Sequence, residues 1–167
     1  MTEDAMAALG ILESAMRIEQ EGRQFYLKAA RTTQDKKGQE TFATLADDEQ
    51  KHYDLIKRQH TALTSEGRWV GSPDIKPVDI DLGKPLFPRG IETLKKTITA
   101  TSSDWDALLF GLDIEIKSYD LYRKAASQID DPLGKPMFAF LAGQEQSHFD
   151  VLMMRYDALF GPIAWQA

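Results

Sequence analysis

Four long segments of this chain have a helical apolar period, and a glutamate interrupts the apolar stripe of each. Apolar or small residues recur at steps of three and four over about 4–33, 37–64, 103–129 and 132–160. The interrupting residues, one near the middle of each stripe, are Glu19, Glu49, Glu115 and Glu145. The pattern predicts an all-α chain in which four helices share one core and four carboxylates meet at one level of it.

Two histidines join these carboxylates on the same helical faces. His52 and His148 follow the second and fourth glutamates by three residues, a spacing that shares one face of a helix. An uncompensated buried ion costs several kcal/mol, whereas two divalent cations would balance four carboxylates. Oxygen ligands with one imidazole per metal suit iron or manganese, and zinc can occupy the same groups. We therefore predict two metal ions, with the ligands Glu19, Glu49, His52, Glu115, Glu145 and His148.

The turn signals divide the four segments into two hairpins. Short turns are predicted near Asp35 and Asp130–Asp131, with Asp131 capping a helix that starts at Pro132. The link from about 65 to 102 holds four of the seven prolines and is far longer than a bundle turn requires. A short helix around 90–100 is possible inside it. We predict one domain over 1–167, an antiparallel four-helix bundle made of hairpins 4–64 and 103–160 and a long crossover.

The two hairpins also resemble each other in sequence. Residues 41–56 lie over 137–152 at an offset of 96, and eight of the sixteen positions are identical. At the same offset, residues 19–30 lie over 115–126 and share a glutamate, a tyrosine and the sequence Lys-Ala-Ala. A match held at one offset across two helices predicts a duplicated hairpin with a pseudo-two-fold axis.

The glutamates, histidines and two tyrosines together resemble the rubrerythrin branch of the ferritin-like di-iron superfamily. The matching elements are E-Q-K-H from Glu49, E-Q-S-H from Glu145, and a tyrosine seven residues after each remaining glutamate, Tyr26 and Tyr122. The resemblance implies that Glu19 and Glu115 each bind one metal, that Glu49 and Glu145 bridge the pair, and that His52 and His148 bind one metal each. We expect both tyrosine hydroxyls to hydrogen-bond ligating carboxylates, with ordinary core packing as the alternative.

Two departures distinguish this chain from rubrerythrins proper. Those proteins carry a rubredoxin-like domain whose iron is held by four cysteines, and this sequence has no cysteine. They also carry a further glutamate, associated with peroxide reduction, three residues after the first ligand of the third helix. Ser118 occupies that position here, and Gly22 is its counterpart in the first hairpin. Both small residues leave space beside the expected metals.

Composition excludes several other functions. A net charge of −6 argues against a basic nucleic-acid-binding face. No apolar run is long enough to span a membrane, and the acidic start does not resemble a signal peptide, so we expect a cytoplasmic protein. The acidic runs Asp47–Asp48 and Asp130–Asp131 are interpreted as solvated surface or caps, and the first could also attract cations.

Three functions fit the sequence. The first is a di-iron oxidoreductase of ferroxidase or peroxidase type, acting on Fe(II), peroxide or dioxygen with an external electron donor. The second is a protein that binds or stores iron or another metal without turnover. The third is a metal-free interaction bundle. A homodimer or other homo-oligomer is expected, since the long link would let hairpins pair within one chain or exchange between two.

Overall fold

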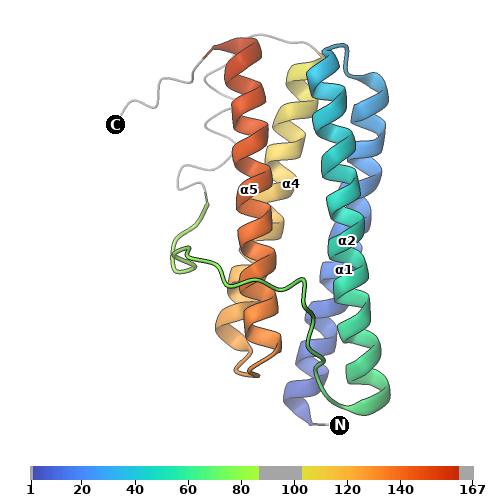
Figure 1. Ribbon diagram of the computed structural model, residues 1–167, viewed down its shortest axis with the longest axis vertical. Helices are drawn as coiled ribbons and strands as arrows, with labels where there is room; N and C mark the ends of the chain where they lie inside the picture. Colours follow the sequence, from blue (N-terminus) through green and yellow to red (C-terminus); the bar gives the residue numbers. More distant parts are fainter. Residues whose placement is uncertain (1, 87–102, 162–167) are drawn as a thin grey trace.

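The computed structural model describes residues 2–86 and 103–161, and this part of the chain is all-helical with no strand. Four long helices form an antiparallel bundle of two hairpins, in which α1 packs against α2 and α4 against α5 (Figure 1). Their bounds are α1 Glu3–Thr32, α2 Lys36–Glu66, α4 Ser103–Gln128 and α5 Gly134–Phe160. The fold prediction is confirmed. The possible short helix around 90–100 lies outside the described residues.

The turn between α1 and α2 is fixed by aspartates from two hairpins. Asp35 caps α2 by accepting a hydrogen bond from the Gly38 N–H at 2.7 Å, as an N-cap residue does. Asp104, near the start of α4, accepts the N–H groups of Gln34 and Asp35 at 3.0 and 3.1 Å. Arg155 of α5 adds a 2.5 Å ion pair to Asp35. The two hairpins are therefore joined at this end of the bundle.

The second turn differs from its prediction by two residues. Asp131 was expected to cap a helix beginning at Pro132, but α5 begins at Gly134. The Asp131 carboxylate accepts the N–H groups of Leu133 and Gly134 at 2.8 and 3.0 Å. It thus does cap the helix, but residues 131–133 form the capping turn rather than the first helical turn.

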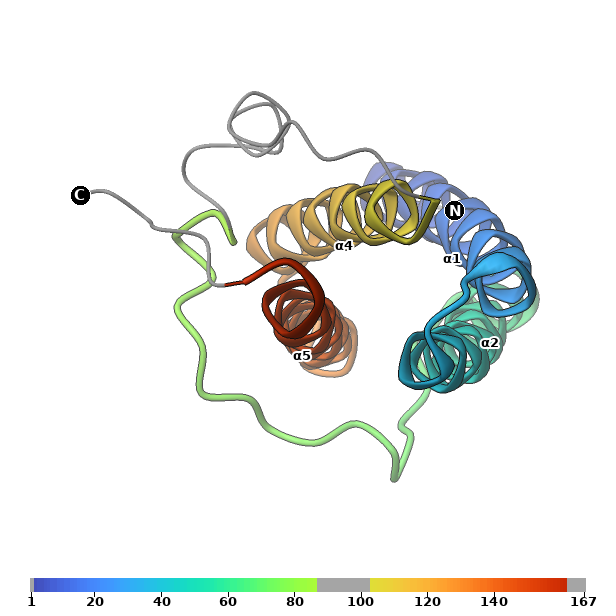
Figure 2. The same ribbon diagram turned by 90° about the horizontal axis from the view of Figure 1, so that it is seen from above.

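The connection after α2 crosses the bundle on the outside of α5. Figure 1 shows α2 and α4 running in the same direction, so the link must return along the bundle, and Figure 2 shows its described part wrapping around α5. Two glycines of α5 permit this close contact. A Cβ at Gly134 would lie 2.7 Å from the Trp69 ring, and one at Gly143 would lie 2.8 Å from Val78. Both contacts require glycine on the helix.

The bundle core has apolar clusters at its two ends and a polar layer between them. One cluster packs the Tyr122 and Phe138 rings together, and the other packs Tyr26 and Phe42, with centroid separations of 6.3 and 5.9 Å. The polar layer lies where the stripes of all four helices carry their glutamates. None of the helices in residues 2–86 and 103–161 has the apolar length needed to cross a membrane.

Candidate metal centre

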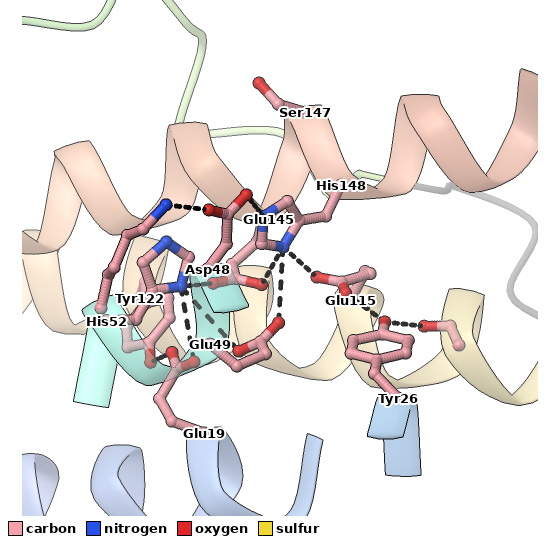
Figure 3. A network of polar contacts seen from close by, with 12 residues as sticks. Glu19, Tyr26, Asp48, Glu49, His52, Glu115, Tyr122, Glu145, Ser147 and His148 are labelled. Carbon is pink, nitrogen blue, oxygen red and sulfur yellow. Dashed lines mark hydrogen bonds and ion pairs between the residues drawn. The ribbon is translucent and has the colours of Figure 1, made fainter. Parts of the chain in front are cut away.

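The six predicted ligands meet in the middle of the bundle and are buried. Each helix contributes one glutamate, and α2 and α5 each add a histidine one turn later (Figure 3). The exposed fractions are 0% for Glu19, Glu115 and Glu145, 2% for Glu49, and 4% for His52 and His148. The structure thus brings together all six residues that the helical period placed on one face. His60, the remaining histidine of the sequence, lies apart and contacts Glu13 at 3.3 Å.

The first half of the layer centres on His52. Its Nδ1 atom lies 3.0 Å from Glu145 Oε1, 3.4 Å from Glu19 Oε2 and 3.9 Å from Glu49 Oε2. One ligand atom from each of these four residues falls within 4.8 Å of the others. The group therefore offers a cation one imidazole nitrogen and three carboxylate oxygens.

The second half repeats this geometry around His148. Its Nδ1 atom lies 3.4 Å from Glu49 Oε1, 3.5 Å from Glu115 Oε2 and 3.7 Å from Glu145 Oε2. Glu49 and Glu145 thus turn one oxygen toward each histidine, whereas Glu19 faces His52 and Glu115 faces His148. The two imidazole rings stack with centroids 5.3 Å apart. The arrangement therefore offers two adjacent groups of candidate ligands that share the carboxylates of Glu49 and Glu145.

Unsatisfied polar atoms show that the residues fit a cation. Seven buried side-chain atoms of the layer have no hydrogen-bond partner among the described residues. They are Glu19 Oε2, Glu49 Oε1, His52 Nδ1, Glu115 Oε2, both carboxylate oxygens of Glu145, and His148 Nδ1. Buried polar atoms are almost always satisfied in folded proteins. Metal ions at the centre of the layer would satisfy these seven atoms.

Two tyrosines satisfy the oxygens that face away from this centre. The Tyr26 hydroxyl donates to Glu115 Oε1, and the Tyr122 hydroxyl donates to Glu19 Oε1. Both rings are fully buried, and each contact joins α1 to α4 across the two hairpins. The tyrosines therefore fix the carboxylates of Glu19 and Glu115 so that the free oxygen of each faces the layer.

The electrostatics of the layer also indicate missing positive charge. Burial, reinforced by neighbouring carboxylates, raises the pKa values of Glu49 and Glu115 well above their usual range. Burial would also raise the pKa of Glu145, but its close contacts with Glu115 and both histidines hold it below its ordinary value. Burial would lower the pKa of His52, yet the charges of Glu19 and Glu145 raise it to about 10. The raised pKa values mean that protons on these side chains offset the repulsion between the carboxylates. A bound cation would compete with those protons.

Sequence reasoning did not single out Asp48 as part of this site. The sequence favours solvated surface or a cap at Asp47–Asp48, with attraction of cations as a further role, but the Asp48 Oδ2 atom lies 3.4 Å from the Nε2 atom of His148 on the other hairpin. Lys51 holds the other oxygen, Oδ1, at 2.7 Å. The internal repeat gives no signal for Asp48, because its counterpart in the second hairpin is the uncharged Gln144.

A groove between α1 and α4 leads toward the layer. It encloses about 490 Å³ and is lined on α1 by Gly22 and Phe25 and on α4 by Phe110 and Ile114. A Cβ added at Gly22 would lie 3.6 Å from the Glu49 carboxyl carbon. Because Gly22 has no side chain, the groove approaches the Glu49 carboxylate closely at this position, beside Ile114. Its counterpart Ser118 is 1% exposed.

Comparison with known proteins gives a family match for the first hairpin. The Rubrerythrin family model matches residues 10–77, which cover most of α1, all of α2 and the start of the connection. Over these residues the chain is similar to rubrerythrins. Its buried Glu–His cluster is compatible with a di-iron site. No rubredoxin domain is indicated, and the sequence has no cysteine to hold a rubredoxin iron.

A solved structure extends the fold comparison to both hairpins. A hypothetical protein from Pyrococcus furiosus superposes with a TM-score of 0.65 over 91% of this chain and 89% of its own. The two sequences are 21% identical, so the likeness concerns the fold alone. No curated protein matches the chain significantly.

Proposed function

We propose that this chain is a di-iron carboxylate oxidoreductase that oxidises Fe(II), or reduces peroxide or dioxygen, with electrons from an external donor. The observation that carries the proposal is the shared geometry of Glu49 and Glu145, each of which turns one oxygen toward each histidine. Such bridging carboxylates hold two metals close enough to act on one small molecule. The six ligands, with one imidazole per metal and otherwise oxygen, favour iron, with manganese or zinc as chemical alternatives.

In the proposed centre the bundle supplies position and charge. Glu19 with His52, and Glu115 with His148, would complete the two positions, and the bridging pair would hold them at a fixed separation. Tyr26 and Tyr122 donate to the terminal carboxylates and keep them from rotating out of the layer. When bound, iron would supply the electrons that pass to the oxidant by alternating between its ferrous and ferric states.

Access for a small molecule is supported by the groove at Gly22. The opening lies on the α1–α4 side, beside Glu49, and apolar rings from Phe25 and Phe110 flank it. An uncharged molecule the size of dioxygen or peroxide fits such an opening without desolvation of a charge. The groove therefore favours an oxidant of this class over an organic substrate that would need a deep pocket.

Anaerobic loading with Fe(II) followed by oxidant tests the proposal. We expect iron-dependent near-ultraviolet absorbance and consumption of dioxygen or peroxide, recorded separately for each oxidant. The double variant Glu49→Leu/Glu145→Leu should show neither, whereas Glu21→Leu/Glu40→Leu, which removes two exposed glutamates, should behave as the wild type. Wild-type protein that neither changes its spectrum nor consumes oxidant would contradict the proposal. Stoichiometric iron without turnover would instead favour a binding or storage protein.

A further inference from the structure

The two histidines of the layer differ in what their outer nitrogens meet. The Nε2 atom of His148 faces Asp48 Oδ2 at 3.4 Å, and Lys51 Nζ holds Asp48 Oδ1 at 2.7 Å. The contacts form a chain from Lys51 through Asp48 on α2 to His148 on α5. Figure 3 shows Asp48 beside His148. The Asp48 side chain is 28% exposed, which leaves its charge partly shielded from water.

The corresponding positions around His52 carry no charge. At the offset of 96, Gln144 replaces Asp48 and Ser147 replaces Lys51. The Ser147 hydroxyl donates to the Gly143 carbonyl of its own helix at 3.1 Å. Within residues 2–86 and 103–161, no hydrogen bond or ion pair joins His52 Nε2 to another residue, although Gln144 lines the same groove as His52.

This difference bears directly on metal affinity. A histidine that ligates through one nitrogen and donates its other N–H to a carboxylate is held in one orientation and is a more basic ligand. The Asp48 carboxylate is the group that faces the outer nitrogen of His148, and its negative charge also favours a cation nearby. In residues 2–86 and 103–161, no carboxylate contacts the Nε2 atom of His52 in this way.

We propose, on the basis that the layer holds two cations as in the proposed function, that the two positions are inequivalent and that Asp48 is the positioning residue responsible. The position formed by His148 with Glu49, Glu115 and Glu145 binds a divalent cation more tightly and fills first. The position formed by His52 fills second. A chain that looks duplicated in its six ligands is therefore asymmetric in the residues that support them.

Anaerobic titration of the full chain with Co(II), followed by calorimetry and visible absorbance, tests this inference without any turnover. The wild type should bind two Co(II) ions in two steps of different affinity. Asp48→Asn should weaken the tighter step about 10–100-fold, the usual effect of removing such a supporting carboxylate. The weaker step should change far less. Asp47→Asn removes the same charge from the exposed neighbouring residue and should change neither step.

The reciprocal variant should raise, rather than lower, an affinity for Co(II). Gln144→Asp places a carboxylate at the counterpart position and should strengthen the weaker step, which brings the two affinities closer together. Circular dichroism and the unfolding midpoint of each variant show whether it is folded.

The outcomes separate this inference from the proposed function. Two Co(II) ions bound with equal affinity, or an Asp48→Asn titration identical to that of Asp47→Asn, would overturn the inequivalence and leave the di-metal centre standing. A wild type that binds no Co(II) would overturn the di-metal centre and the inequivalence with it.

Discussion

The ends of the bundle and its middle lie on the same four helices but are held together by opposite chemistry. At each end a tyrosine and a phenylalanine stack inside an apolar cluster, and burial itself stabilises the fold. In the middle, four carboxylates and two imidazoles occupy the equivalent core positions, and burial without a counter-ion destabilises. The ends therefore account for folding, and the proposed binding of metal ions would account for the middle.

Truncation of a side chain in an end cluster should cause the largest change in the free energy of unfolding. Phe138 is fully buried and packs edge-on against Trp69 at 6.0 Å and stacks on Tyr122. Phe138→Ala should lower the free energy of unfolding of the metal-free protein by about 3–5 kcal/mol because it leaves a cavity. Urea denaturation measures the change. Phe110→Ala, in which the ring is 56% exposed, should cost no more than about 1 kcal/mol.

Replacement of Glu49 and Glu145, the proposed bridging glutamates, should raise rather than lower the free energy of unfolding of the metal-free protein. Glu49→Leu/Glu145→Leu removes two buried carboxylates, and the metal-free variant should be about 1–4 kcal/mol more stable than the metal-free wild type. Thermal and urea unfolding after chelation give this difference. A loss of stability would mean that the layer supports the fold by itself, and it would break the contrast between middle and ends.

Tyr26 and Tyr122 belong to the apolar end clusters but donate hydrogen bonds to glutamates of the polar layer. Removal of their hydroxyls therefore tests how the two regions are joined. Tyr122→Phe keeps the apolar ring but leaves Glu19 Oε1 without its donor, which should cost about 1–3 kcal/mol in unfolding free energy. Tyr26→Phe should behave alike because Tyr26 donates to Glu115 in the same way. Tyr53→Phe, a half-buried tyrosine outside the layer, serves as the matched control. Equal stabilities for all three variants would contradict a specific role of the hydroxyls.

The smallest change in the free energy of unfolding is expected for the partly exposed ion pair between Arg155 and Asp35. Partial burial would raise the pKa of Asp35, but hydrogen bonds from Arg155 and the Gly38 N–H hold it below its usual value. A lowered pKa in the folded state adds stability that is full above about pH 4 and is lost as pH falls further. Arg155→Met should therefore cost about 0.2–1 kcal/mol at neutral pH, and the difference from wild type should shrink in acid. A difference independent of pH would show that Arg155 acts through packing instead.

Much of this architecture was predictable because the helical period is a local property. The residues at steps of three and four are buried on every helix. On α1 they are Leu12, Ala15, Glu19, Gly22 and Tyr26, and on α5 they are Phe138, Leu141, Glu145, His148 and Leu152. The clustering of the six glutamate and histidine side chains followed from the same period, since each stripe places its polar residues at the same level. Their roles as ligands stay predictions.

Contacts between elements that are distant in sequence were not predictable in the same way. The contact of Asp48 with His148 depends on how α2 lies against α5, and spacing within one helix carries no information about that. The path of the connection is a second case. Its contacts, such as Trp69 against Gly134, follow no period that a pattern could reveal.

Metal content tests the central claim most directly. The protein should be loaded anaerobically with excess Fe(II), desalted and analysed for iron per chain, together with Glu49→Leu/Glu145→Leu. We predict two irons per wild-type chain and none in the double variant. Wild-type protein that retains no iron, or a double variant that retains as much as the wild type, would contradict a metal centre in the middle of the bundle.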